Sequence, residues 1–265
     1  MRYFDSNYQR LVYIEQKADP KYWDKLWDVK NFKKIVSSIR KISFVYSNTT
    51  KYLSKGAKIL EGGCGKGQYV YALDNWGYDT YGIDYAKNTI EHINKHFPEL
   101  QVICGDVRKL PYKKDFFDGY WSFGVIEHFY NGYDDILKEM KRVIKSNGFL
   151  FITFPHMSLL RKIKSKLGGY PLFDTQMGDD NFYQFALDYK RVVKDLEMYG
   201  FSLKKKKYLD GVKGLKDEIL IGKKYLQKLY DARSFVLKVF KHSLGICLAP
   251  VTSHSILLVM ELKDK

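Results

Sequence analysis

Short apolar runs alternate with helical patterns over residues 56–154. The runs predict buried strands at 57–61, 79–84, 100–106, 116–123 and 149–155. A helical period that ends at glycine or proline predicts helices between them at 68–77, 86–97 and 133–148. Such an alternation indicates a parallel sheet with helices on both faces.

The flanking segments are less regular. Residues 1–50 have the pattern of helices, and residues 156–186 are basic and then polar without a clear period. Further elements are predicted as a helix at 186–201, an edge strand at 202–210, helices over 215–245 and a strong last strand at 254–262. We therefore expect an α/β fold with a doubly wound, mostly parallel, seven-stranded sheet, an antiparallel last strand and a helical cap.

Two insertions are expected on the side of the sheet where ligands bind. Ligands of open α/β sheets bind outside the carboxyl ends of the strands. Residues 156–186 leave the fifth strand at that edge, and an antiparallel hairpin of the last two strands would place residues 209–254 there too. We divide the chain into a lead-in or cap over 1–50, a ligand-binding core over 51–155, and residues 156–265, which carry both cap insertions.

Composition narrows the class only in part. The chain has 265 residues, 45% of them hydrophobic, and a formal net charge of +15. This charge is compatible with nucleic acid, an anionic membrane, an acidic substrate or a lysine-rich solvated surface. Three widely spaced cysteines form no disulfide or metal pattern, and neither a signal peptide nor a long charge-free apolar run is visible. We expect a cytoplasmic protein without a bound metal.

The stretch EGGCGKG, residues 61–67, follows the first core strand and precedes a helix. Its four glycines permit a tight turn whose backbone N–H groups face a ligand. The G-x-G-x-x-G spacing of dinucleotide-binding loops fails, because Gln68 stands where the last glycine would follow Gly63. An NAD-dependent oxidoreductase is therefore the weaker alternative.

Acidic residues end the first three core strands, namely Glu61, Asp84 and Asp106. A carboxylate about 20 residues after the glycines can accept both hydroxyls of a ribose. One at the next strand end can accept from an exocyclic amine. Each alone could be a cap or loop residue, but the three together favour a cationic nucleoside over a dinucleotide phosphate.

These motifs together resemble the class I S-adenosylmethionine-dependent methyltransferases, in particular their type 11 small-molecule branch. ILEGGCGKG resembles the family's acidic-x-G-x-G-x-G loop, and GIDYA resembles its ribose-binding strand end. GDVRKLPY and FDGYWSFGVIEHF resemble its adenine-binding segment and fourth strand, and ADPKYWDKLW its lead-in helix. Gly62 departs from the family, which usually has an aliphatic residue there, and we expect a looser turn.

The resemblance implies S-adenosylmethionine as cofactor and gives roles to individual residues. Glu61 would lie near the methionyl ammonium, Asp84 would hold the ribose, and Tyr85 would pack on the adenine. The complete implied set of cofactor-binding residues is Glu61, Gly62, Gly63, Cys64, Gly65, Asp84, Tyr85, Gly105, Asp106, Val107, Ser122, Phe123 and Gly124.

Methyl transfer from a sulfonium needs an aligned nucleophile, and an oxygen nucleophile must also lose a proton. His128, after the fourth strand, is the leading candidate for the base, and Glu127 could orient it or bind the cofactor. Both residues could equally start a helix without any catalytic role. His156, after the fifth strand, is a second candidate for the base.

We expect methylation of a small or medium-sized acceptor, preferably at oxygen, such as a sugar, a glycan intermediate or another metabolite. Amino-methylation of nucleic acid usually needs an Asn/Asp-Pro-Pro-aromatic turn, and this chain has SFGVIEHF at that place. Nucleic acid is therefore not the expected partner. A non-catalytic binding protein on the same fold is an alternative, and the oligomeric state is not predicted.

Basic and apolar residues mix in both insertions, at 161–166 and 234–250. They are consistent with a lid that covers the cofactor and attracts an anionic acceptor. They are also consistent with an amphipathic contact to an anionic membrane that gives access to a lipid-linked substrate. We favour the lid, because Lys238 and Lys241 interrupt the apolar pattern.

Overall fold

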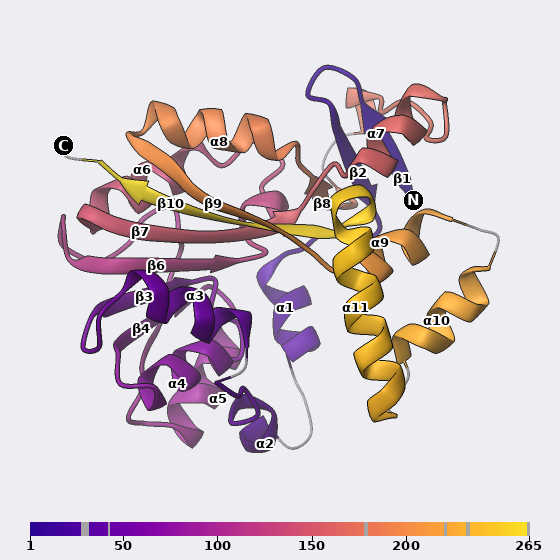
Figure 1. Cartoon of the computed structure of the whole chain (residues 1–265). Helices are drawn as coiled ribbons and strands as arrows, with labels where there is room; N and C mark the ends of the chain where they lie inside the picture. Colours follow the sequence, from indigo (N-terminus) through magenta and orange to yellow (C-terminus); the bar gives the residue numbers. More distant parts are fainter. Residues whose placement is uncertain (28–31, 42, 178–179, 220–221, 232–233, 264–265) are drawn as a thin grey trace.

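The computed structural model describes residues 1–27, 32–41, 43–177, 180–219, 222–231 and 234–263 (Figure 1). Its main sheet has the strand order β5-β4-β3-β6-β7-β10-β9. The strands are β3 (Lys58–Gly62), β4 (Asp79–Asp84), β5 (Gln101–Cys104), β6 (Phe117–Phe123), β7 (Ile144–Pro155), β9 (Phe201–Leu209) and β10 (Ser255–Leu262). Strands β3 to β7 are parallel, and β10 runs antiparallel between β7 and β9. The predicted sheet, its antiparallel last strand and its edge strand are confirmed.

Helices cover both faces of this sheet (Figure 1). One face carries α3 (Phe44–Tyr52), α4 (Gln68–Asn75) and α5 (Lys87–His96), and the other carries α6 (Asp134–Val143) and α8 (Tyr189–Met198). Successive strand residues alternate between the two cores, as the pleat of a strand requires. Ile59 belongs to the α3–α4 side and Leu60 to the α6–α8 side, and both are fully buried.

The expectation that residues 1–50 are helical is wrong for the first 14 residues. They form a hairpin of β1 (Arg2–Asp5) and β2 (Arg10–Ile14), which a third strand, β8 (Phe182–Ala186), extends. The partner of β2 on its other side, β8, comes more than 160 residues later in the chain, so local periodicity could not reveal this pairing. Helices follow as expected, at α1 (Pro20–Trp27), α2 (Phe32–Val36) and α3.

Two further boundaries differ from the predicted ones. The helix expected at 133–148 ends at Val143, because Ile144 is buried in the sheet as the partner of Phe117. Residues 156–186, expected to be irregular, contain α7 (Leu159–Lys166) and the short 3-10 helix η2 (Thr175–Met177) in addition to β8. A second short 3-10 helix, η1 (Ile126–His128), follows β6. The helical stretch after β9 is divided into α9 (Gly211–Glu218), α10 (Lys223–Asp231) and α11 (Phe235–Thr252); residues 220–221 and 232–233 of that prediction lie outside the described residues.

Both insertions leave the sheet at the same edge, as expected. Ser255, the first residue of β10, pairs with Pro155 at the end of β7 and with Leu209 at the end of β9. The segment after β7 and the segment before β10 therefore start from the carboxyl end of the parallel strands. Helices α7, α9 and α11 gather on that side of the molecule (Figure 1).

Candidate functional site

A cavity of about 330 Å³ opens at the carboxyl ends of β3 to β6, and we call it the strand-end cavity. Its volume lies within the range of roughly 300–1,000 Å³ that small-molecule sites occupy. The predicted site residues that line it are Gly63, Asp84, Tyr85, Gly105, Asp106, Val107, Phe123, Gly124 and His128. Motifs from four different strand ends are thus brought to one cavity.

The glycine loop at this cavity has no room for side chains. Gly63 has a φ of 75°, and a Cβ there would lie 2.5 Å from the Val125 side chain. A Cβ on Gly62 would lie 1.9 Å from the Tyr120 hydroxyl of the neighbouring strand. Tyr120 thus fills the space that an aliphatic side chain at position 62 would take, and the looser turn expected from Gly62 stays a prediction.

Asp84 fastens the glycine loop to the end of β4. Its Oδ2 accepts the backbone N–H of Gly65 at 2.8 Å, and its Oδ1 accepts that of Ala86 at 2.9 Å. Burial raises the pKa of this carboxyl, although the backbone donors act in the opposite direction. Each oxygen keeps a further lone pair, so Asp84 can still accept two hydroxyl donors from a ligand in the cavity.

Asp106 shares its carboxylate with a residue that sequence reasoning missed. Arg108 binds it with two nitrogens, at 2.6 Å and 3.0 Å to Oδ2, and lies over the ring of Phe129. Burial opposes ionisation of Asp106, but the hydrogen bonds and charge of Arg108 outweigh it and lower its pKa. Arg108 also lines the cavity; its position two residues after the aspartate was the only signal in the sequence.

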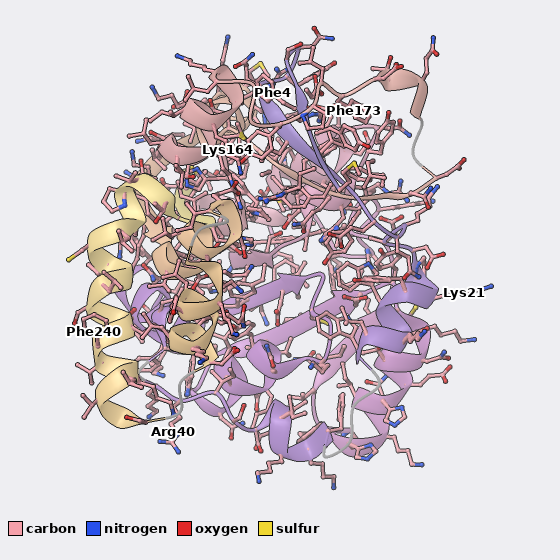
Figure 2. All side chains as sticks on the ribbon, turned by 90° about the vertical axis from the view of Figure 1, so that its right-hand side faces the viewer. Phe4, Lys21, Arg40, Lys164, Phe173 and Phe240 are labelled. Carbon is pink, nitrogen blue, oxygen red and sulfur yellow. The ribbon has the colours of Figure 1, made fainter. Side chains whose placement is uncertain are left out.

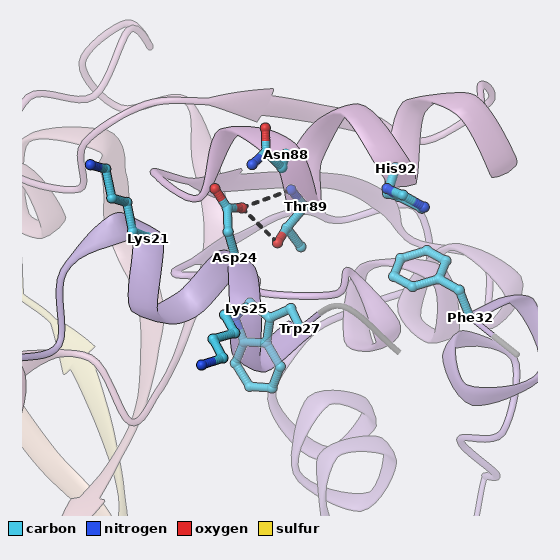
Figure 3. A pocket seen from close by; sticks show the side chains of 8 residues that line it. All are labelled: Lys21, Asp24, Lys25, Trp27, Phe32, Asn88, Thr89 and His92. Atoms are coloured by element: carbon cyan, nitrogen blue, oxygen red, sulfur yellow. Dashed lines mark hydrogen bonds between the residues drawn. The ribbon is translucent and has the colours of Figure 1, made fainter. Parts of the chain in front are cut away.

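Helix α1 forms one wall of the strand-end cavity. Trp23 and Trp27 line it, with their rings stacked 5.6 Å apart, and Trp27 packs against Gly65. Asp24 accepts both the N–H and the hydroxyl of Thr89, at 3.0 and 3.1 Å, and so fixes α1 to the first turn of α5 (Figure 3). The lead-in helix was predicted from the sequence, but no role in the site was predicted for its two tryptophans, which the i, i+4 spacing places on one face.

Three buried polar atoms at the ends of β3 and β6 have no hydrogen-bond partner among the described residues. They belong to Glu61 (Oε2), Ser122 (Oγ) and Glu127 (Oε2). Burial raises the pKa of Glu61 well above its usual value and that of Glu127 to about 8. The lining of the cavity includes none of these three residues. Glu127 lies behind Gly124, with its Oε1 3.3 Å from the position of a Cβ on that glycine. A cationic ligand in the cavity would stabilise the ionised form of the two buried carboxyls.

The other predicted cofactor residues also lie outside the lining. Gly62, Cys64 and Gly65 are absent from it, in addition to Glu61 and Ser122. The Cys64 side chain is buried, lies 3.1 Å from the position of a Cβ on Gly82, and has a pKa raised by burial. Cys64 therefore belongs to the packing beneath the loop.

His128 lines the strand-end cavity and has a defined tautomer. Its Nδ1 lies 2.7 Å from the Tyr183 carbonyl oxygen, which can only accept, so we assign the proton to Nδ1 and a free lone pair to Nε2. Trp23 packs against the ring edge-on at 5.0 Å. Burial lowers the pKa of His128 to about 4, which keeps the imidazole neutral at pH 7.

His156 lies apart from this cavity. Its Nε2 is 2.6 Å from the Ser253 hydroxyl, and its ring stacks on Tyr208 at 5.5 Å. Burial, followed by the charge of Arg161, lowers its pKa to about 3. The structure thus separates His156 from His128, and the described residues that line the strand-end cavity do not include it.

A second cavity, of about 720 Å³, lies between β9, α9 and α11, and we call it the cap cavity. Its cationic lining comes from Lys207, Lys213, Lys238 and Lys241, with His242 beside them. Phe44 lines it too and packs edge-on at 6.2 Å against Phe123, a lining residue of the strand-end cavity. The linings of the two cavities are therefore in contact through these two aromatic rings.

A family described as a methyltransferase domain matches residues 60–152. Over 101 residues the chain is 27% identical to a protein of Mycolicibacterium smegmatis named "Probable S-adenosylmethionine-dependent methyltransferase", a match that covers 38% of this chain and 39% of that protein. The chain thus spans little more than a third of that relative. It is 28% identical over 171 residues to the ubiquinone biosynthesis O-methyltransferase of Pelagibacter ubique, covering 63% of this chain and 68% of that protein.

The fold is similar to that of solved structures at low sequence identity. The [4+2]-cyclase SpnF superposes with a TM-score of 0.57 at 13% identity, covering 96% of this chain and 99% of the cyclase. This likeness concerns the fold alone. The family match, by contrast, covers the glycine loop and the ends of β4, β5 and β6, and the cofactor of that family is S-adenosylmethionine. Residues 60–152 are thus a methyltransferase domain of the class I S-adenosylmethionine-dependent type.

Proposed function

We propose that this chain binds S-adenosylmethionine in the strand-end cavity and transfers its methyl group to a small or medium-sized acceptor. The observation that carries this proposal is the convergence of Gly63, Asp84, Asp106 and Gly124 on one cavity. The unpartnered carboxyl oxygen of Glu61 beside them supports a ligand with a positive charge. When bound, this cofactor supplies a methyl group that its sulfonium has already activated.

The proposed cofactor contacts follow the chain from strand to strand. Asp84 would hold the ribose hydroxyls, while Tyr85, Asp106 and Val107 would surround the adenine. Gly63 and Gly65 leave space for the methionine portion. Glu61 would lie near the ammonium, and Ser122, Phe123 and Gly124 beside the sulfonium. Gly105 lines the same cavity, while Gly62 and Cys64 lie outside the lining and would shape the loop from beneath. Residues 51–155 would then form the cofactor-binding part, with residues 1–50, 156–186 and 209–254 as a cap.

His128 is the proposed acceptor of the proton that an oxygen nucleophile releases. Its Nε2 lone pair and its place on the cavity wall support this role. A pKa of about 4 makes it a weak base, so we expect a contribution nearer the lower end of the usual 10²–10⁴-fold range, and a larger contribution from positioning. Glu127 would orient the site from behind Gly124. A role of His156 as the base stays a prediction, and its position outside the strand-end cavity does not support that role.

The acceptor we propose carries an anionic group and reacts at oxygen. The lysines of the cap cavity support the anionic group, because the lining of that cavity contacts the lining of the strand-end cavity through Phe44 and Phe123. Reaction at oxygen is supported by the relative named as an O-methyltransferase. A binding protein without catalysis is the second candidate, since a fold by itself does not determine an activity.

A screen of hydroxyl-bearing acids that measures release of S-adenosylhomocysteine tests the proposal. With an acceptor found, His128→Ala should lower kcat while cofactor affinity stays near wild type, and His156→Ala should leave kcat unchanged. The acid limb of the wild-type rate should lie near pH 4, because His128 is neutral above its lowered pKa. Cofactor binding without turnover on any acceptor would favour the binding protein, and equal effects of both histidine variants would contradict the role of His128.

A further inference from the structure

The contact between α9 and α11 determines which side of α11 faces the protein. A Cβ on Gly211 would lie 2.4 Å from the Gly245 carbonyl oxygen, and one on Gly214 would lie 1.6 Å from that of Thr252. Such distances mean that the backbones of the two helices touch. The Gly245 side of α11 is therefore its inner side.

The opposite side of α11 is apolar and exposed. Steps of about 100° per residue place Val236, Val239, Phe240, Ser243, Ile246, Cys247 and Val251 away from Gly245, and we call them the outer face of α11. Val236 is 72% exposed, Ile246 61% and Phe240 55%. Phe240 lies at the outer edge of the molecule (Figure 2). No residue of this outer face is charged.

The two lysines that favoured a lid do not interrupt this face. Lys238 and Lys241 line the cap cavity, together with Gly245 and Ala249, on the inner side of the helix. Lys241 donates to the Tyr230 carbonyl oxygen at 2.7 Å. Basic and apolar residues are mixed in the sequence, but they lie on different sides of the helix. Lys238 and Lys241 therefore do not favour a lid over a membrane contact.

Exposed lysines border this apolar face. Helix α10, which adjoins α11, exposes Lys224 and Lys228 beside Tyr225, whose exposure is 77%. Helix α7 packs against α11 and exposes Lys166 next to Leu167, which is 80% exposed. An uncharged apolar face with a basic border is complementary to an anionic bilayer, where the apolar side chains enter the acyl boundary and the lysines meet the headgroups.

We propose that the outer face of α11 docks in the plane of an anionic lipid bilayer, with α10 and its lysines on the headgroups. Among the described helices none is by itself long and apolar enough to cross a membrane. One pair, 224–231 with 236–252, meets that criterion only when joined, and it is bent by 117°. Since the inner side of α11 packs on α9, only its outer side is available, which fits a helix lying in the bilayer surface. This proposal does not depend on methyl transfer.

Co-sedimentation of the full chain with vesicles tests this docking. Vesicles of phosphatidylcholine mixed with phosphatidylglycerol should bind the wild type, and vesicles of phosphatidylcholine alone should bind it weakly. The double variant Val236→Asp/Phe240→Asp should lose binding by tenfold or more. Lys224→Gln and Lys228→Gln should each lower it by about fivefold at low salt. Met198→Asp, at a 70% exposed position of α8, is the matched control and should bind like the wild type.

Circular dichroism and S-adenosylmethionine affinity of each variant show whether it is folded, independently of vesicles. Failure of the wild type to bind anionic vesicles would overturn the proposal. So would binding that survives in folded Val236→Asp/Phe240→Asp. A dimer that forms in solution without vesicles and that the same variant dissociates would assign the outer face to a second copy of the chain instead.

Discussion

The protonation of Glu61 and Glu127 is expected to depend on whether a charged ligand is bound. Both are buried, and each has one carboxyl oxygen without a partner in the described part of the chain. Burial raises the pKa of Glu61 well above its usual value and that of Glu127 to about 8, so Glu127 holds a proton at pH 7. A buried group of this kind changes its protonation when a charge arrives.

We therefore predict that binding of S-adenosylmethionine releases protons near pH 7. A nearby cation favours the carboxylate, so the raised pKa values should fall and the protons should leave. Calorimetry in two buffers of different ionisation enthalpy measures this as a difference in apparent binding enthalpy. Glu61→Gln and Glu127→Gln should each reduce the difference, which assigns the protons. A binding enthalpy that is the same in both buffers would contradict the account.

Helix α1 connects the strand-end cavity to helix α5. Its tryptophans line the strand-end cavity, and Asp24 caps α5 from outside that helix. Loss of a cap of this kind costs about 0.5–2 kcal/mol. We predict that Asp24→Ala lowers the midpoint of thermal unfolding and weakens S-adenosylmethionine binding, because α1 loses its anchor. Lys21→Ala, at an exposed position of the same helix, should change neither quantity. Asp24→Ala with wild-type affinity would show that α1 does not contribute to the site.

The α9–α11 pair offers a matched test of backbone contact. A Cβ on Gly214 would lie 1.6 Å from the Thr252 carbonyl oxygen, whereas one on Gly245 would meet only the Val212 side chain at 3.8 Å. Gly214→Ala should therefore lower the unfolding midpoint. Gly245→Ala should keep or raise it, since alanine is favoured over glycine inside a helix by about 1 kcal/mol. Equal midpoints for the two variants would show that the helices are not in such close contact.

The elements that the sequence predicted well are those whose partners are near in the chain. Strands β3 to β7 and their helices show their periods locally, and the strand-end positions of Asp84 and Asp106 follow from them. The hairpin of β1 and β2 was missed because β8, its partner, comes more than 160 residues later. The helix expected at 133–148 was too long because the burial of Ile144 depends on Phe117 in another strand.

The same distinction applies to the candidate site. Glycine and carboxylate positions could be predicted, because they stand at strand ends and parallel strands end at one edge. The contributions of Trp23, Trp27 and Arg108 could not, because they depend on how α1 and a loop fold over that edge. Likewise, the separation of Lys238 from the outer face of α11 depends on the packing of α9.

In the whole molecule, two adjacent regions contribute to the proposed function. The sheet and its glycine loop provide the strand-end cavity, and α9 and α11 close a cationic cap cavity beside it. Some of the lysines behind the net charge of +15 lie in the cap cavity, and others border the apolar outer face of α11. The proposed function of the first region requires that the strand-end cavity binds S-adenosylmethionine through Asp84.

Calorimetric titration of S-adenosylmethionine into the wild type and the variants Asp84→Ala and Asp79→Ala measures this binding directly. The wild type should bind it and should not bind NAD. Asp84→Ala should lose about 1–3 kcal/mol or more of binding free energy, because ribose hydroxyls lose their acceptor and Gly65 loses its anchor. Asp79→Ala, at the other end of β4, should bind like the wild type. Absence of binding to the folded wild type, or unchanged affinity in folded Asp84→Ala, would contradict the account.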